Sequence, residues 1–209
     1  MINKTDFRLL VISDRKSVKN NSLDKIADKC FAAGVKAFQL REKDLSSSDL
    51  LILACKIGVS ASKHRSKLII NDRLDITLLS RAAGIHSPEK GIHPKDVRRF
   101  NKKLITGKST HSANSAVRAE KEGYDYIIFG PVFRTKSKIK FGKPKGLKEL
   151  EDVCSKVKLP VYAVGGINPA RAKKCVNAGA AGAAVIGAVM KSDNIKKTVL
   201  EFKKSLGRL

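Results

Sequence analysis

The chain has 209 residues, 42% of them apolar and 30% charged, which is the composition of a globular protein with a sizeable core and excludes a disordered one. Trp is absent and only 5% of the residues are aromatic, which argues against a surface that stacks nucleobases. Lys and Arg outnumber Asp and Glu by 43 to 19, and the formal net charge of +24 favours anionic partners. Because the lysines are spread along the chain, a solvated basic surface explains most of this excess.

The apolar segments are too short for a secretory signal or a membrane span. The run from Leu9 to Ile12 is soon followed by charge, and the longest uncharged stretch, around Gly182 to Met190, is rich in Gly and Ala. The four cysteines show neither a CxxC pair nor the spacing of zinc ligands, which fits thiols in a reducing compartment. We therefore expect a cytoplasmic protein without membrane contact.

Short apolar runs alternate with amphipathic stretches along the chain. The apolar runs predict strands at residues 8–13, 37–43, 67–72, 84–87, 104–109, 126–130, 161–166 and 182–187. The stretches between and after them predict helices at residues 22–34, 46–64, 76–83, 93–100, 113–122, 147–157, 169–177 and 195–206.

This alternation predicts an α/β fold, a single-domain TIM (β/α)8 barrel that covers residues 1–209. The strands are almost continuously apolar, as expected where both faces are buried. A doubly wound open sheet is the alternative architecture. In a barrel, active-site residues lie at the C-terminal ends of the strands and in the loops that follow.

Polar residues stand at those strand ends. In AFQLREK, residues 37–43, the side chains of Gln39, Arg41 and Lys43 would share one column if the whole stretch were a strand. The later strand ends add Asn71, Asp72, Ser109, His111, Thr135, Ser137, Lys138, Gly165, Gly166 and Gly187.

These residue types suit a phosphorylated ligand. Arg41 can bind phosphate oxygens in a bidentate manner, and Lys43 and Lys138 add point charges. The glycines after strands seven and eight let backbone N–H groups approach a phosphate. Asp72 offers a carboxylate for Mg²⁺, which would bridge diphosphate oxygens. Together these groups predict a site for a diphosphate or a similar anion.

Structural explanations stay open for each of these residues. Arg41 and Lys43 could form salt bridges with the acidic residues beside them, and Asp72 could cap a helix or pair with Arg73. His111 could be a polar residue of the core. The remaining histidines are better explained as structural or solvated: His64, His86 and His93.

The chain contains, in this order, the motifs QLREK, IND, STHS, GPVFRTKSK and AVGGI. In order and spacing they resemble the thiamine phosphate synthase/thiazole tautomerase family over nearly the whole chain. The resemblance implies a TIM barrel and a Mg²⁺-dependent transferase. This enzyme joins 4-amino-2-methyl-5-(diphosphomethyl)pyrimidine to a thiazole phosphate and releases thiamine phosphate and diphosphate. Diphosphate leaves first, and the thiazole nitrogen then attacks a stabilised pyrimidine cation.

The resemblance also implies roles for the strand-end residues. The pyrimidine would contact Gln39, and the diphosphate would contact Arg41, Lys43, Asn71 and Lys138. The thiazole phosphate, or the loop closing over it, would meet Thr135, Ser137, Gly166 and Gly187. The catalytic candidates are Lys138, Ser109 and His111, and the Mg²⁺ ligand is Asp72.

One departure from the synthase pattern concerns its second Mg²⁺ carboxylate, an Asp that follows the Gly-[Ile/Val]-His motif. That position falls near Gly91 here, and Glu89 is a nearby substitute. The tautomerase branch also lacks this Asp. It isomerises a thiazole carboxylate phosphate without metal, with a histidine at the position of His111 as acid and base. The intact Asn71-Asp72 pair favours the synthase.

Other classes of function are weaker. A nucleic-acid-binding protein would account for the charge, but the basic residues are scattered and no helix-turn-helix, RRM or zinc pattern is present. We therefore expect small phosphorylated molecules as partners, and no nucleic acid. The sequence leaves the formation of a homo-oligomer open.

Overall fold

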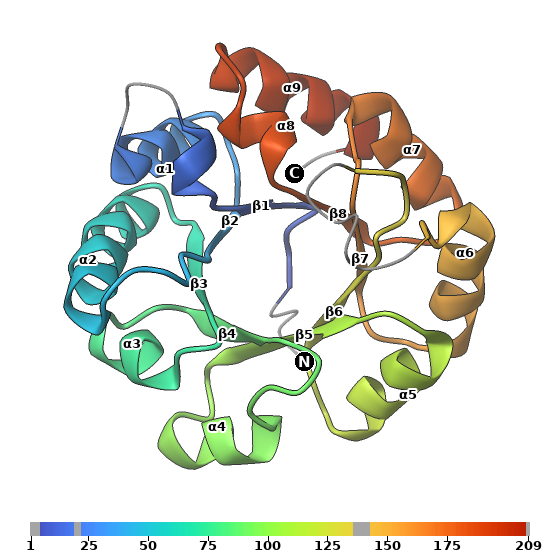
Figure 1. The fold of residues 1–209 in the computed structure, drawn as a ribbon, viewed down its shortest axis with the longest axis horizontal. Coiled ribbons are helices and arrows are strands. Elements are labelled where there is room, and N and C mark those ends of the chain that lie inside the picture. The colour runs from blue at the N-terminus through green and yellow to red at the C-terminus, as the bar shows by residue number, and fades with distance from the viewer. Residues whose placement is uncertain (1–4, 19–21, 136–142, 208–209) are drawn as a thin grey trace.

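A closed barrel of parallel strands ringed by helices makes up this protein in a computed structural model, which describes residues 5–18, 22–135 and 143–207 (Figure 1). The strands follow one another around the barrel in sequence order, and β8 pairs with β1 to close it. This arrangement confirms the predicted TIM barrel and excludes the open sheet.

The elements lie close to their predicted positions. The strands are β1 (Leu9–Ile12), β2 (Ala37–Leu40), β3 (Lys67–Asn71), β4 (Gly84–Ser87), β5 (Ile105–Thr110), β6 (Tyr126–Phe129), β7 (Val161–Val164) and β8 (Gly182–Val185). The helices are η1 (Arg15–Ser17), α1 (Leu23–Ala32), α2 (Ser47–Lys63), α3 (Leu74–Leu79), α4 (Pro94–Phe100), α5 (Ala113–Lys121), α6 (Gly146–Lys156), α7 (Pro169–Asn177), α8 (Gly187–Met190) and α9 (Ile195–Leu206).

Side-chain caps explain where several of these helices begin. Ser46 accepts a hydrogen bond from the backbone N–H of Asp49 at the start of α2, and Ser112 forms a capping box at the start of α5. Asn168 caps α7, with Pro169 in its first turn. These local signals are readable in the sequence, which is why the predicted and observed starts agree.

The predicted ends of β2, β7 and β8 lie two or three residues beyond the observed ends. Strand β2 ends at Leu40, so the prediction that Gln39, Arg41 and Lys43 share one strand column is wrong. The backbone N–H of Arg41 donates to the hydroxyl of Ser13 instead of continuing a ladder. Gly187 does not end β8 as expected but begins the short helix α8.

Aromatic rings fill the barrel interior towards the N-terminal ends of the strands. The rings of Phe7 and Tyr162 stack at 4.9 Å between centroids, and Tyr126 meets both edge-on at 5.8 and 5.6 Å. Gly107 makes room for this cluster, because a Cβ there would lie 2.1 Å from Cζ of Tyr126. The rings form a closed floor, so the mouth at the C-terminal ends carries the cavities.

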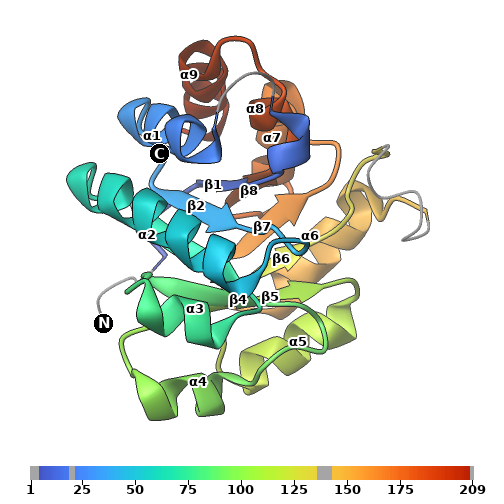
Figure 2. The ribbon, with the colours of Figure 1, turned by 60° about the vertical axis from the view of Figure 1, so that its left-hand side comes forward.

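The outer faces of the strands pack against the surrounding helices, which Figure 2 shows from the side. Val11, Phe38, Ile70 and Ile127 are fully buried in this layer. Each such side chain contributes about 1.5–3 kcal/mol by leaving water. Within the described residues, none of the helices has the length and apolar character needed to cross a membrane.

Candidate active site

Three neighbouring cavities open at the C-terminal ends of the strands. The central cavity, of about 230 Å³, is lined by Gln39, Arg41, Asn71, His86, Ser109 and His111. The lysine cavity, of about 210 Å³, is lined by Glu42, Lys43, Asn71, Asp72 and Arg73. The glycine cavity, of about 270 Å³, is lined by Asp14, Thr135, Gly165, Gly166, Gly187 and Lys191.

Gln39 projects inward from β2 into the central cavity. Its side chain is buried, with the residue 1% exposed, and its amide Nε2 has no hydrogen-bond partner among the described residues. An unpaired buried amide N–H costs about 1–3 kcal/mol. This donor therefore suits a ligand that brings a hydrogen-bond acceptor into the central cavity.

A chain of hydrogen bonds crosses the wall of the central cavity. The hydroxyl of Tyr126 lies 3.2 Å from Nδ1 of His86, and Nε2 of His86 lies 2.9 Å from Oγ of Ser109. Burial raises the pKa of Tyr126, so its hydroxyl keeps its proton. His86 is 2% exposed and orients Ser109 at the cavity surface.

His111 follows β5 directly and lines the central cavity. Its Nδ1 lies 2.6 Å from the carbonyl oxygen of Gly130. Because a carbonyl only accepts hydrogen bonds, Nδ1 donates in this contact and the ring orientation is fixed. The structure thus brings His111 and Ser109 to the same cavity, as the sequence predicted.

The loop after β2 turns around Glu42. Its carboxylate is buried, at 4% side-chain exposure, and it accepts hydrogen bonds from the hydroxyl of Ser13 at 2.6 Å and the backbone N–H of Arg15 at 3.1 Å. Burial raises the pKa of Glu42, against the effect of these hydrogen bonds. With Glu42 held inward, Arg41 lines the central cavity and Lys43 the lysine cavity.

The acidic neighbours of this loop pair with cations other than Arg41 and Lys43. Asp44 forms ion pairs with Arg15 at 2.8 Å and Lys16 at 2.7 Å. Within the described residues, Arg41 and Lys43 form no ion pair. The described residues therefore do not support the explanation that these two cations form salt bridges.

Asp72 lines the lysine cavity directly after β3. It adopts a left-handed backbone conformation, with φ of 61°, and its backbone N–H donates to the carbonyl of His86. Its neighbour Arg73 pairs with Asp75, and that pairing lowers the pKa of Asp75. Asp72 is thus neither the partner of Arg73 nor the N-cap residue of α3, which is Arg73.

The donors around Asp72 fit a Mg²⁺ ion held jointly with a phosphorylated ligand. The described residues contain no group of three or more His, Cys, Asp or Glu side chains that could hold a metal ion by themselves. Mg²⁺ typically takes one or two carboxylates and completes its shell with phosphate oxygens and water. The carboxylate of Asp72 and the amide oxygen of Asn71, on one cavity, meet this need.

Glu89 does not reach this group. It is exposed and does not line any of the three cavities. At Gly91, a Cβ would lie 2.6 Å from Cδ of Pro88, so the loop has no space for a side chain at the position where synthases carry an Asp. The turn after β4 therefore adds no carboxylate beside Asp72.

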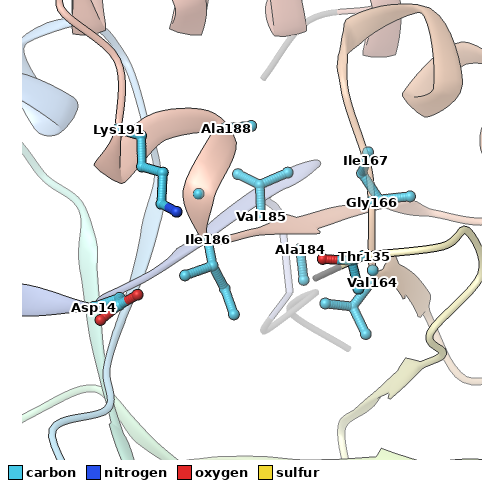
Figure 3. A pocket seen from close by; sticks show the side chains of 12 residues that line it. Asp14, Thr135, Val164, Gly166, Ile167, Ala184, Val185, Ile186, Ala188 and Lys191 are labelled. Atoms are coloured by element: carbon cyan, nitrogen blue, oxygen red, sulfur yellow. The ribbon is translucent and has the colours of Figure 1, made fainter. Parts of the chain in front are cut away.

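Glycines and small or apolar side chains make up most of the glycine cavity (Figure 3). Gly165 and Gly166 have φ values of 99° and 63°, and a Cβ on Gly166 would lie 2.7 Å from the carbonyl oxygen of Arg134. Thr135 and Lys191 add a hydroxyl and an ammonium to the lining. The backbone N–H groups of the glycines, this hydroxyl and this ammonium suit a phosphate, while Asp14 adds a carboxylate to the same lining.

Sequence reasoning missed several residues that line these cavities, among them His86, Asp14 and Lys191. The place of His86 in β4, beside Asn71 in β3, was an available signal. Asp14 and Lys191 belong to turns after β1 and β8 that carry no motif. Two predicted residues, Ser137 and Lys138, lie outside the described residues.

The closed barrel, with cations and glycines at its mouth, defines a TIM-barrel enzyme of the class built for phosphorylated small molecules. A family model, thiamine monophosphate synthase, matches residues 9–189. The chain therefore belongs to the thiamine monophosphate synthase family.

Individual relatives agree. The chain is 44% identical to a protein of Aquifex aeolicus over 179 residues, 86% of this chain and 95% of the relative. It is 33% identical to the thiamine-phosphate synthase of Clostridium botulinum over 210 residues, 100% and 98% of the two chains. The solved thiamine phosphate pyrophosphorylase of Pyrococcus furiosus superposes with a TM-score of 0.87 at 28% identity, over 98% of this chain and 96% of that one.

These relatives confirm the predicted family and activity. The chain is an enzyme of thiamine phosphate synthesis, a transferase.

Proposed function

We propose that the chain couples a pyrimidine diphosphate held in the central and lysine cavities to a thiazole phosphate held in the glycine cavity. The unpartnered buried amide N–H of Gln39 carries this assignment, because it requires an acceptor in the central cavity. A pyrimidine ring nitrogen supplies one.

The cations beside Gln39 hold the diphosphate. Arg41 offers a guanidinium from the central cavity, and Lys43 offers an ammonium from the lysine cavity, with Asn71 between them on both linings. Two proposed ligands lie outside the described residues: Lys138 for the diphosphate and Ser137 for the thiazole phosphate. Gly166, Gly187 and Thr135 bind the phosphate of the thiazole through backbone N–H groups and a hydroxyl.

Asp72 and Asn71 are the proposed holders of Mg²⁺. When bound there, the ion supplies positive charge to the leaving diphosphate. The side chains of this chain carry the remaining work. Gln39 orients the pyrimidine, and Ser109 and His111 line the central cavity beside it. These groups position two substrates, which is what a dissociative substitution needs.

The proposal extends to the setting of the enzyme. Residues 1–209 act as one barrel domain in the cytoplasm, on small phosphorylated molecules and without nucleic acid. Size-exclusion chromatography with light scattering reports whether the barrel forms a homo-oligomer. Filter binding at physiological salt reports nucleic-acid affinity, and tight binding there would contradict the proposal.

A coupling assay tests the proposed function. Purified protein receives the pyrimidine diphosphate and the thiazole phosphate with Mg²⁺ or with EDTA, and thiamine phosphate and diphosphate are quantified. We expect both products in equal amounts, only with Mg²⁺, and at least a hundredfold loss in Asp72→Ala. Turnover that survives EDTA and Asp72→Ala would overturn the metal assignment. A metal-independent isomerisation of the thiazole carboxylate, lost in His111→Ala, would assign the tautomerase instead.

A further inference from the structure

Two of the cavities share a wall. Asp14, Val164 and Ile186 line both the glycine cavity and the central cavity. Two ligands held in neighbouring cavities touch where those cavities meet, so a bond between them forms at this wall. Val164 and Ile186 are apolar, which leaves Asp14 as the only charged group of the wall among the described residues.

Asp14 is held in place by the turn that leaves β1. The hydroxyl of Ser17 donates a hydrogen bond to Oδ2 of Asp14 at 2.6 Å. No Lys or Arg of the described residues forms an ion pair with Asp14, although Lys191 lines the same cavity. In Figure 3 its carboxylate lies at the edge of the cavity, across from Thr135 and Gly166.

The coupling reaction creates positive charge at the place where the two substrates meet. The bond between the pyrimidine methylene carbon and the diphosphate oxygen breaks, and its electron pair goes to the diphosphate. The lone pair of the thiazole nitrogen then forms the new C–N bond, and no proton moves. Positive charge appears first on the methylene and its ring, and it ends on the thiazolium.

We propose that the carboxylate of Asp14 stabilises this positive charge at the wall between the two cavities. A fixed charge acts strongly on a developing one where apolar groups, here Val164 and Ile186, exclude water. The thiazole phosphate, which Asp14 would repel, is held by Thr135 and Gly166, which lie across the glycine cavity from Asp14 (Figure 3). This inference rests on the proposed function.

Asp14→Asn tests the role, because it keeps the shape of the side chain and removes its charge. We expect the single-turnover rate of thiamine phosphate formation to fall about 10- to 100-fold. In calorimetry, the cationic product thiamine phosphate should bind at least fivefold more weakly. The affinity of Asp14→Asn for thiazole phosphate should stay within about twofold of wild type, since the neutral ring of this ligand carries no positive charge to stabilise.

Ser17→Ala is the matched control. It removes the hydrogen bond to Asp14 but keeps the carboxylate, and we expect the rate and both affinities to stay within about threefold of wild type. Equal losses in the two variants would mean that Asp14 only shapes the turn, and would overturn the proposal. Three other results for Asp14→Asn would also overturn the proposal. These are an unchanged rate, an equal loss of affinity for both ligands, and a higher Mg²⁺ concentration needed for activity.

The controls separate this proposal from the proposed function. If wild-type protein makes no thiamine phosphate, the proposed function fails first. If wild type makes it and Asp14→Asn matches the wild-type rate, only the role of Asp14 fails.

Discussion

The hydroxyl of Ser13 lies 2.6 Å from the carboxylate of Glu42 and donates a hydrogen bond to it. The same hydroxyl accepts a hydrogen bond from the backbone N–H of Arg41 at 2.7 Å. One side chain directly after β1 therefore fixes both the end of β2 and Glu42, the residue between the two cations Arg41 and Lys43. Ser13 and Glu42 are both buried. The two cations that they orient face the cavities.

Removing the carboxylate of Glu42, which accepts the hydrogen bond from Ser13, should weaken the binding of the diphosphate substrate. In Glu42→Ala we expect KM for the pyrimidine diphosphate to rise roughly tenfold, with kcat changed much less, because Arg41 and Lys43 lose their fixed positions. Steady-state kinetics over both substrates measures this. Asp44→Ala is the control, since exposed Asp44 shares the partner Arg15 but does not line a cavity. An equal rise of KM in both variants would contradict the role of Glu42.

Glu42 should also give the stability of the protein a distinct pH dependence. Burial holds the pKa of Glu42 above its ordinary value of 4.5, so the folded state binds this proton more tightly than the unfolded state. Its contribution to stability is therefore largest below the ordinary pKa and falls as pH rises towards the raised pKa. Glu42→Gln does not titrate. Wild type should lose stability relative to Glu42→Gln as pH rises above 4.5 and through the raised pKa.

Urea unfolding at several pH values measures this difference. Asp28→Asn serves as a control of opposite sign, because a hydrogen bond from Ser60 lowers the pKa of Asp28. A lowered pKa contributes stability at neutral pH that is lost as pH falls through it. A pH-independent difference between wild type and Glu42→Gln would show that the proton of Glu42 is not linked to folding.

The sequence predicted the barrel well because its signals are local and repeated. Most strands are short apolar runs buried on both faces, and helices such as α2 and α7 begin at polar caps. The end of β2 could not be predicted in this way. It depends on a contact between Ser13 and the Arg41 backbone, two residues 28 positions apart.

The same limit explains which site residues were found. Gln39, Asn71 and Ser109 stand at strand ends, where the fold class directs attention, and the structure brings all three to one cavity. Lys191 lies beyond β8, and only the turn of α8 carries it back to the glycine cavity. His86 looked structural because a lone histidine on a short apolar strand gives no sign of its partners, Tyr126 and Ser109.

Two glycines at the same cavity should respond differently to a methyl group. Gly166→Ala puts Cβ 2.7 Å from a carbonyl oxygen at a φ of 63°, so we expect a loss of about 1–3 kcal/mol in unfolding free energy. KM for thiazole phosphate should rise as the loop shifts. At Gly187 a Cβ meets only Lys191, at 3.7 Å, so Gly187→Ala should keep wild-type stability. Thermal unfolding of both variants decides this, and equal destabilisation would contradict the cavity geometry.

Tyr126 and Tyr162 both belong to the ring cluster of the floor, but of the two it is Tyr126 that also contacts His86 in the wall of the central cavity. Tyr126→Phe removes the hydroxyl that contacts His86, and the hydrogen-bond chain to Ser109 loses its inner end. Tyr162→Phe removes a hydroxyl that donates to the carbonyl of Phe7 at 2.6 Å, away from the cavities. Each loss should cost about 1–2 kcal/mol of unfolding free energy, since each breaks a buried hydrogen bond.

The activities of Tyr126→Phe and Tyr162→Phe should differ. In Tyr126→Phe we expect kcat/KM for the pyrimidine diphosphate to fall roughly tenfold, because His86 no longer fixes Ser109. In Tyr162→Phe it should stay within about twofold of wild type, because the floor only supports packing. Denaturant unfolding and steady-state kinetics on both variants give the comparison. If activity falls equally in the two, it depends on the packing of the rings and not on the hydrogen-bond chain through His86.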